Sequence, residues 1–573
     1  MRNRLERALQ RLSTHLLWVA PLLVSLLCIG ATLAALNKLT YAAFARDQGI
    51  FQYVAWAMRS GEKAYRDFHE INGPLPHAWN ILLQALGGED VHVFRSLDTG
   101  FVLVVYAASA ITIPRWVGLT LSRGALAAWS LAGLAVLGAQ FARYDWWHAN
   151  QREGFYAALV LGSIAMQAAA HVTKSSRHAL VLFGFSSMLT TLTWFGKPPC
   201  AIFALLQVAV LAADRANVSL SLRRVLMAST VGALASAASM AAFVAATGDL
   251  SAGISFLGKV PLLHHTIWNR SFVDQYHAYD NAPRLDWAFV TTAGFVAAYF
   301  VLKLPRLSLL ALVLPIGGFL VFAGQGKGFP YHLQMVTLGT SVMHLVILVA
   351  LAKAGHERRE RASAMTVVAT LAALALGYKC RDDSRLSPAA RSDWATLGST
   401  KERRASHEYL DRFEWGDYFT TDLHDAATWV NERTRPDERI QTYGLDPFFM
   451  FLARRQSATP VIYDFELNID PALAGGTGAN LSSAQRVELT AMRDATEQMM
   501  LTRVTASPPA AFVFFDRAPF SHPPDGEADF AAHCPALYAW LDTRYAKATR
   551  IGTVRVRLRG DVAERANQAP DAR

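Results

Sequence analysis

The chain has 573 residues, of which 52% are hydrophobic and only 17% are charged, and its mean hydropathy is positive. This composition is too apolar for an ordinary soluble protein of this size, and it predicts membrane-spanning helices. The formal net charge of +10 comes largely from basic residues in short connections between apolar stretches. It therefore indicates membrane orientation and gives no indication of nucleic-acid binding.

Apolar stretches long enough to cross a hydrocarbon core of roughly 30 Å recur from the N-terminus to residue 378. Their number, about eleven, predicts a mainly α, polytopic membrane protein. The first stretch follows a basic N-terminus, but no convincing cleavage site comes after it, so we expect it to remain as the first helix. The stretches are 16–36, 91–113, 122–141, 153–171, 178–195, 198–213, 225–247, 287–303, 307–323, 333–352 and 364–378.

The distribution of basic residues predicts the orientation of the helices. Arg2, Arg4, Arg7 and Arg11 place the N-terminus in the cytoplasm, because basic residues resist translocation. Since the number of spans is odd, the C-terminal segment is expected on the periplasmic face of a bacterial inner membrane. The other basic residues assigned to the cytoplasm are Arg115, Arg123, Lys174, Arg177, Arg215, Arg223, Arg224, Lys303, Arg306, Lys353, Arg358, Arg359 and Arg361.

Three outward segments are too long to be simple connections: 37–90, 248–286 and the residues after 379. Residues 1–378 are predicted to form a transmembrane domain, 379–420 a charged linker or lid, and 421–573 a periplasmic α/β domain, because helix and strand patterns alternate there. The predicted strands lie near 440–443, 512–515 and 553–558, and the predicted helices lie around 429–430 and at 482–502 and 535–546.

The first outward segment is predicted to hold two amphipathic helices around a turn-rich centre. Ile50, Val54 and Met58 share one helix face, and residues 81–85 repeat the pattern. Helices of this kind are expected to lie along the membrane surface. Glycine and proline in the stretch 72–76 separate the two helices.

The strongest local motif is Arg46-Asp47-Gln48-Gly49-Ile50-Phe51, just outside the first span, followed by Tyr65-Arg66-Asp67-Phe68 and Asn72-Gly73-Pro74-Leu75. A carboxylate at that place can meet a substrate whose lipid tail lies in the bilayer. Asp47 is therefore a candidate general base on an acceptor hydroxyl, or a ligand of a divalent metal ion that activates it. The alternative is that Asp47 is the N-cap of the surface helix, and spacing alone does not separate these interpretations.

The order of these features resembles the GT-C superfamily of membrane glycosyltransferases, especially the branch of bacterial aminoarabinose transferases and protein O-mannosyltransferases. The resemblance covers nearly the whole chain. It implies inverting transfer of a sugar from a polyprenyl-phosphate donor to a lipid, glycan or protein acceptor on the periplasmic face. It also implies that residues 1–378 form the catalytic domain, that Asp47 is catalytic, and that Arg66 and Asp67 contact substrate.

One departure from the family concerns the donor phosphate. Many members have a lysine before the proline of the first-loop turn, whereas this chain has Asn72-Gly73-Pro74. A departing polyprenyl phosphate needs positive charge, so other cations at the outer boundary are expected to supply it. The alternative for each cation is snorkelling or helix capping. The candidates in this group, with the aromatic residues beside them, are Arg152, Lys197, Lys327, Tyr331 and His332.

A second carboxylate is expected in the loop 141–153, because members of the family commonly use an acidic residue between the third and fourth spans. Asp145 and Glu153 both qualify. Glu153 is preferred, because it stands beside Arg152 at the start of a span. Trp146 and Trp147 have the simpler explanation of interfacial anchors.

Other ionisable residues are assigned structural roles. Arg95 and Asp98 stand three apart on one helix and can neutralise each other. The His- and Asp-containing segment 248–286, with His264, His265, Asp274, His277 and Asp280, matches no defined metal-ligand spacing and is predicted to be a polar lid. Cys380 and Cys534 are interpreted as unrelated free thiols, with a disulfide as the alternative.

Two other functions compete with glycosyl transfer. A transporter or flippase of lipid-linked glycans would carry ionisable or Gly/Pro-broken segments at mid-membrane depth, and a non-catalytic GT-C-like subunit would need no catalytic carboxylate. No phosphate-cradling Gly-rich loop occurs in the predicted cytoplasmic segments, which argues against a nucleotide-sugar donor and against an ATP-driven pump. The predicted partners are the bilayer, a polyprenyl-phosphate sugar donor and its acceptor.

Overall fold

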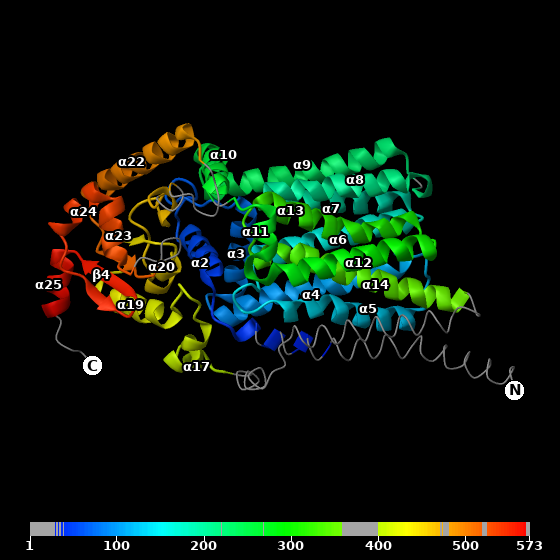
Figure 1. The fold of residues 1–573 in the computed structure, drawn as a ribbon, viewed down its shortest axis with the longest axis horizontal. Coiled ribbons are helices and arrows are strands. Elements are labelled where there is room, and N and C mark those ends of the chain that lie inside the picture. Colours follow the sequence, from blue (N-terminus) through cyan, green and yellow to red (C-terminus); the bar gives the residue numbers. More distant parts are fainter. Residues whose placement is uncertain are drawn as a thin grey trace. The chain divides into compact units, whose positions relative to one another are not determined.

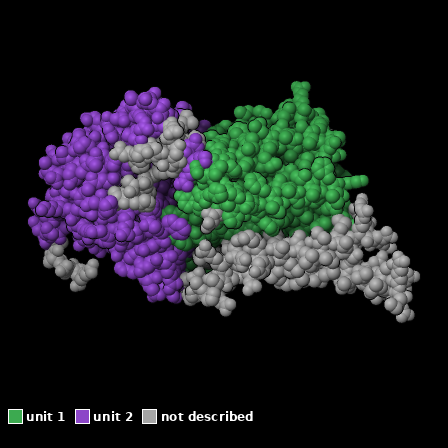
Figure 2. Space-filling model, in the orientation of Figure 1, with its two compact units in different colours: residues 1–41, 90–240, 272–398 green, residues 42–89, 241–271, 399–573 purple. Residues whose placement is uncertain are grey.

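The computed structural model, shown in Figure 1, describes residues 39–218, 220–267, 269–357, 399–469, 481–517 and 524–568, with Ile29, Thr32, Leu33, Leu36, Asn37 and Leu473. Most of the first predicted span, all of the last, Cys380, Arg358, Arg359 and Arg361 lie outside the described residues, as do the side chains of 259–268. The chain divides into two units (Figure 2). Unit 1 is Met1–Tyr41, Asp90–Met240 and Phe272–Gly398, and unit 2 is Ala42–Glu89, Ala241–Ser271 and Ser399–Arg573.

Unit 1 is a bundle of helices that run side by side (Figure 1), and each apolar stretch predicted between 91 and 352 forms a helix. Side-chain caps determine where some of these helices begin. At the start of α4, the Asp90 carboxylate accepts from the backbone N–H of His92 at 2.8 Å. The longer helices are α4 (Val91–Trp116), α5 (Arg123–Gly138), α6 (Arg152–Val172), α7 (Ser176–Trp194), α8 (Ala201–Ala213), α9 (Leu222–Thr247, ending in unit 2), α12 (Asn281–Val301), α13 (Val313–Gln325) and α14 (Gln334–Glu357).

Short elements connect these helices. They are η1 (Ala139–Arg143), η2 (Pro198–Cys200), η3 (Arg215–Asn217), α11 (Phe272–His277), η4 (Ala278–Asp280), η5 (Arg306–Leu312) and η6 (Pro330–Leu333). Six helical segments in the described part of the chain are long and apolar enough to cross a membrane: Val91–Trp116, Arg123–Phe141, Arg152–Val172, Leu222–Thr247, Arg306–Gln325 and Pro330–Leu351.

Helices α6 and α14 form the centre of unit 1. The most apolar parts of these two segments are 78% and 83% buried, against 22% for α9. Helix α6 packs against α4, α7 and α14. A buried polar network joins it to its neighbours: Ser163 Oγ lies 2.6 Å from Thr190 Oγ1 and accepts from Gln207 Nε2 at 3.0 Å. Such bonds in an apolar surrounding fix the register of α6 against α7 and α8.

Unit 2 contains a four-stranded sheet of order β1-β2-β4-β3. Strand β1 (Ile440–Tyr443) is parallel to β2 (Ala511–Phe515), and β4 (Val554–Leu558) is antiparallel to both β2 and β3 (Thr549–Ile551). The three predicted strands are confirmed, and β3 is an additional one. Helices and short turns surround the sheet: α17 (Lys401–Arg404), α18 (His407–Leu410), η8 (Asp411–Phe413), α19 (Thr420–Arg433), α20 (Phe448–Ala453), η9 (Asp464–Glu466), α22 (Ser483–Ala506), α23 (Gly526–His533), α24 (Pro535–Asp542) and α25 (Gly560–Gln568).

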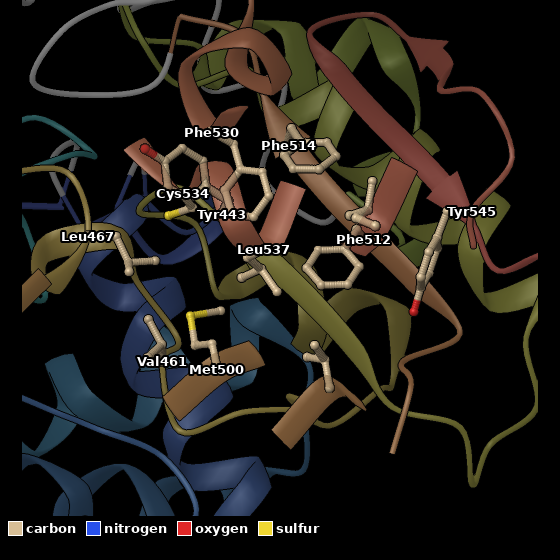
Figure 3. Close-up of a cluster of buried hydrophobic side chains, with 12 residues drawn as sticks. Tyr443, Val461, Leu467, Met500, Phe512, Phe514, Phe530, Cys534, Leu537 and Tyr545 are labelled. Carbon is tan, nitrogen blue, oxygen red and sulfur yellow. The ribbon is translucent and has the colours of Figure 1, made fainter. Parts of the chain in front are cut away.

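Both faces of the sheet are covered. Phe512 and Phe514 of β2 point into a hydrophobic cluster (Figure 3) that α22, α23 and α24 complete, with Met500 and Phe530 among its members. On β2, Phe515 meets Phe449 of α20, with ring centroids 5.9 Å apart. Every residue of β2 is buried, as expected of a central strand that packs on two sides. Cys534 is a buried free thiol in this cluster.

The first outward segment forms α2 (Arg46–Arg59) and α3 (Pro74–Gly87) in unit 2, with α10 (Leu250–Ile267) from the later segment. The two predicted helices are confirmed. Their position along the membrane surface stays a prediction. Within unit 2, ten of the 14 residues of α2 are buried, and α2 packs against α3 and α20. Amide side chains join α2 to α3: Gln52 donates to Asn80 at 3.0 Å, and Gln84 donates to Gln52 at 2.8 Å.

Candidate functional site

Asp47 is the second residue of α2 and is half-buried. The interpretation of Asp47 as N-cap is wrong, since the cap is Ala45, whose N–H donates to the Gln48 side chain at 3.0 Å. Within the described residues, no hydrogen bond or ion pair involves the Asp47 carboxylate. Asp47 is thus an available carboxylate on a rigid element.

Arg46, next in sequence to Asp47, is buried and anchors α2 within unit 2. Its Nε donates to Asp446 at 2.8 Å, its Nη1 to Asp417 Oδ1 at 3.1 Å, and its Nη2 to the Asp417 carbonyl at 2.6 Å. The guanidinium also lies 5.3 Å from the centre of the Tyr418 ring. Burial raises the pKa of Asp446 against the opposing charge of Arg46, and the charge of Asp47 adds to the increase. Arg46 therefore neutralises carboxylates other than that of Asp47.

Gly49 of the same motif permits close packing. A Cβ built at this position would lie 2.6 Å from Cβ of Phe448, the first residue of α20. Only glycine lets α2 approach α20 this closely. The motif thus combines a buried anchor, a half-buried carboxylate and a packing glycine.

Arg66 and Asp67 pair with each other in a turn of unit 2. Arg66 Nε and Nη2 donate to the two carboxylate oxygens at 2.9 and 2.8 Å, and the backbone of Lys63 donates to Asp67 Oδ2 at 2.8 Å. These bonds lower the pKa of Asp67, with the Arg66 hydrogen bond as the largest cause. The Arg66 side chain is 55% exposed, so its outer face is accessible to a ligand.

Glu153 lies at the centre of a buried charged cluster in unit 1. Its Oε1 is 2.5 Å from Lys197 Nζ, 3.3 Å from Arg152 Nε and 3.7 Å from His332 Nε2. Among the described residues, Glu153 Oε2 and His332 Nδ1 have no hydrogen-bond partner. Arg152 and Glu153 open α6, Lys197 precedes η2, and His332 belongs to η6, so three separate connections converge here.

Lys327 and Tyr331 belong to the same region. The positive charges of Lys327, Lys197 and Arg152 all act on the His332 ring. Tyr331 meets His332 edge to face, with ring centroids 4.6 Å apart, and stacks on Phe329 at 5.6 Å. The structure therefore brings together the candidate cations and aromatic residues predicted for unit 1. We call Glu153, Arg152, Lys197, Lys327 and His332 the cationic cluster, because it contains three basic side chains and one carboxylate.

Asp145 has a different environment from Glu153. It accepts from the backbone of Trp147 and of His148 at 3.0 Å each, and from His148 Nδ1 at 2.8 Å. Burial raises the pKa of Asp145, but the His148 side chain and these backbone donors outweigh burial and lower it overall. Asp145 thus stabilises its own turn, whereas Glu153 contacts the cations.

Arg95 and Asp98 of α4 position the loop that leads into α6. Asn150 bridges them: its Oδ1 accepts from Arg95 Nη1 at 3.1 Å, and its Nδ2 donates to Asp98 Oδ2 at 2.8 Å. Asn150 adopts φ of 54°, which asparagine tolerates well. The loop is held further by Gln334 Nε2, which donates to the His148 carbonyl at 2.6 Å.

Sequence reasoning missed Asp417 and Asp446 altogether. Both lie in the segment after residue 399, some 371 and 400 residues from Arg46, and neither belongs to a recognisable motif. The only local signal is Arg46 itself, a charge next to an apolar helix face. No group of three or more His, Cys, Asp or Glu residues within the described ranges is placed to hold a metal ion, and the side chains of His264 and His265 fall outside those ranges.

Comparisons with known proteins identify the fold. No protein-family model and no curated protein matches the chain. Among solved structures, the chain is similar to ArnT from Cupriavidus metallidurans in the apo state, with a TM-score of 0.52 and 14% identity over 94% of this chain and 97% of that chain. The structure of the same protein bound to undecaprenyl phosphate has a TM-score of 0.51 and 14% identity, over 93% and 97%.

A third similar structure is the archaeal oligosaccharyltransferase AglB from Archaeoglobus fulgidus in complex with an inhibitory peptide and a dolichol-phosphate, with a TM-score of 0.47 and 13% identity over 94% of this chain and 74% of that chain. At such low identity, the ArnT likeness establishes the fold alone. The chain has the GT-C fold, as its sequence predicted.

Proposed function

We propose, from the GT-C fold, that this chain is a membrane glycosyltransferase that moves a sugar from a polyprenyl-phosphate carrier to an acceptor hydroxyl on the periplasmic face of a bacterial inner membrane. The observation that carries the proposal is the cationic cluster, in which Lys197 and Arg152 lie 2.5 and 3.3 Å from the buried Glu153. The ArnT structure with undecaprenyl phosphate supports a lipid-phosphate donor.

The cationic cluster has the charge that a phosphate requires. The cluster has three basic side chains and one carboxylate, so it keeps a net positive charge even when His332 is neutral. Lysine and arginine bind phosphate oxygens through charge-assisted hydrogen bonds. As the sugar leaves, negative charge grows on the polyprenyl phosphate, and Arg152, Lys197 and Lys327 stabilise it. In this proposal Glu153 is a positioning residue that holds Lys197 and Arg152 in place.

Asp47 is proposed as the general base. Its carboxylate takes the proton of the acceptor hydroxyl while the acceptor oxygen attacks the anomeric carbon of the sugar. The new bond joins that carbon to the acceptor oxygen, and the bond between the carbon and the phosphate oxygen breaks. The polyprenyl phosphate leaves with the electron pair, and the anomeric configuration inverts. Protein side chains thus accept the proton and stabilise the departing phosphate.

Substitution of Asp47 tests the proposal. Membranes that contain Asp47→Asn are incubated with a radiolabelled polyprenyl-phosphate sugar, and transfer of label to endogenous lipid, glycan and protein fractions is measured. Loss of a general base is expected to slow transfer by about 10² to 10⁴-fold. Folding is expected to be unchanged, since no other described residue hydrogen-bonds to this carboxylate; the melting temperature of the purified protein checks this.

Glu408→Gln is the matched control, because Glu408 is an exposed carboxylate whose side chain is 82% accessible. The control is expected to transfer sugar at the wild-type rate. If Asp47→Asn transfers label as fast as the control, Asp47 is not the base. If the wild-type chain transfers no label from any polyprenyl-phosphate sugar, the proposed function is wrong and a non-catalytic GT-C-like role takes its place.

A further inference from the structure

A cleft of about 550 Å³ opens within unit 2, and its lining includes neither Asp47 nor any residue of the cationic cluster. Three arginines line it: Arg66 from the turn after α2, Arg439 just before β1, and Arg503 near the end of α22. Its volume suits a mono- or disaccharide, since pockets for small ligands measure roughly 300 to 1,000 Å³.

Hydrogen bonds hold several side chains that line the cleft. Arg439 donates from Nη1 to the Ser457 carbonyl and from Nη2 to Glu62 Oε1, each at 2.6 Å. Thr459, which also lines the cleft, donates through its hydroxyl to Gln441 at 2.8 Å. The Arg439 side chain is nonetheless 41% exposed, so part of its guanidinium faces the opening.

Glu62 is the least satisfied group of the cleft. The residue is only 4% exposed, and its Oε2 has no hydrogen-bond partner among the described residues, although Oε1 is paired with Arg439. Burial raises the pKa of Glu62, with Arg439 opposing the increase. A buried carboxylate oxygen without a partner costs free energy unless a ligand or water donates to it. A sugar hydroxyl is a donor of the required kind.

The charges around the cleft specify the rest of the ligand. Arg66, Arg439 and Arg503 outnumber Glu62 and Asp67, so the cleft attracts an anion. Guanidinium groups bind phosphate and carboxylate through paired hydrogen bonds. A ligand that satisfies both the arginines and Glu62 carries an anionic group and hydroxyl donors on one small scaffold.

We infer that this cleft binds an anionic saccharide, phosphorylated or carboxylated, as a recognised part of the sugar acceptor. The identification of the ligand as acceptor rests on the proposed function; the binding site itself does not. In this arrangement the arginines hold the anionic group, and Glu62 Oε2 accepts from a sugar hydroxyl.

Binding of a defined probe to the full-length, detergent-solubilised protein tests the inference. Glucose 6-phosphate is the probe, glucose and inorganic phosphate are the comparison ligands, and affinity is measured by isothermal titration calorimetry. The phosphorylated sugar is expected to bind at least about tenfold more tightly than either comparison ligand, because only it engages both the arginines and Glu62. The double variant Arg66→Ala/Arg503→Ala is expected to weaken its binding by roughly tenfold or more.

Both of these arginines are exposed, so their removal leaves the fold intact. Arg544→Ala, an exposed arginine that does not line the cleft, is the matched control and should bind like the wild type. Equal binding of glucose and glucose 6-phosphate overturns the inference, as does equal binding of inorganic phosphate and glucose 6-phosphate, or an unchanged affinity in the double variant.

The Asp47→Asn variant separates this inference from the proposed function. It should bind glucose 6-phosphate like the wild type while losing sugar transfer. If the chain binds glucose 6-phosphate through the arginines but transfers no sugar, the binding site is supported and the proposed function is rejected. If the chain transfers sugar but does not bind glucose 6-phosphate, the proposed function is supported and the binding site is rejected.

Discussion

Lys197 Nζ lies 2.5 Å from Glu153 Oε1, and the two side chains are 11% and 2% exposed. The residues are 44 positions apart, and the pair joins the turn before η2 to the first turn of α6. Two charges buried together depend on each other, because removal of either one leaves the other less well compensated in a medium of low dielectric. The pair therefore fixes the position of the ammonium that we assign to phosphate binding.

Breaking this pair from one side should destabilise the protein. Lys197→Met leaves Glu153 with a weaker cation partner, and we expect a loss of about 3 kcal/mol in stability. Glu153→Gln/Lys197→Met removes both charges and should recover most of that loss, while sugar transfer stays lost because a phosphate ligand is missing. Thermal melting and transfer assays on the two variants check this. Equal stability of Lys197→Met and the wild type would show that the pair is not coupled.

Gly196→Ala should act on the same site through packing. A Cβ at Gly196 would overlap the phenol of Tyr156 on α6, so the turn that carries Lys197 must shift. We expect the rate of sugar transfer to fall by about 10²-fold, because displacing a group of the site by about 1 Å typically slows a reaction by that factor. Gly196→Ala/Tyr156→Leu replaces the overlapping ring by a shorter side chain and should restore part of the rate. A transfer rate that Gly196→Ala leaves unchanged contradicts this account.

Gly49→Ala should disturb the contact between α2 and α20. Its methyl group would stand 2.6 Å from Phe448 Cβ, and overpacking of this kind typically costs about 1 to 3 kcal/mol. The melting temperature should fall, and the transfer rate should fall with it because Asp47 is two residues away. Gly124→Ala is the control: Gly124 also lies in a helix, and a Cβ there meets nothing within 4 Å. Similar melting temperatures for the two variants would argue against a tight α2–α20 contact.

Asp464 should make the stability of unit 2 depend on pH. Burial, followed by the charge of Asp529, raises the pKa of Asp464 from 3.8 to about 7. The folded state then keeps a proton that the unfolded chain releases, so the contribution to stability is complete below about pH 4 and declines until about pH 7. The change is on the order of 4 kcal/mol over that range.

Thermal melting of the full-length protein between pH 5 and 8 measures this effect. Asp464→Asn cannot ionise and should flatten the decline, with a higher melting temperature than the wild type at pH 8. Asp494→Asn is the control, because the Asp494 side chain is 61% exposed. If the wild type and Asp464→Asn lose stability in parallel over this range, another group is responsible.

Much of the secondary structure could be predicted because its signals are local. Runs of apolar residues marked the helices of unit 1, and short runs such as 512–515 marked strands of unit 2. The strand Thr549–Ile551 was missed, because it is mostly exposed and shows no apolar run. The burial of α2 within unit 2 was not predicted for a related reason: Arg46 is charged, and its buried partners Asp417 and Asp446 lie far along the chain.

The candidate site shows the same division between local and distant signals. Asp47 stood out because a carboxylate followed closely by glycine at the start of a helix is a local pattern. The only local basis for preferring Glu153 to Asp145 was its place beside Arg152 at the start of a span, since both carboxylates occupy one short loop. In the structure Asp145 accepts from the backbone of its own turn, and Glu153 contacts Lys197 and His332 from other connections.

The sequence by itself determined the helical stretches of unit 1 and the resemblance to membrane glycosyltransferases. These properties depend on hydropathy, periodicity and short motifs, which neighbouring residues encode. Only the tertiary structure decided that Lys197 meets Glu153 and that Arg46 meets Asp417 and Asp446. Buried charges must find opposite charges wherever the fold brings them, and distance along the chain sets no limit on that choice.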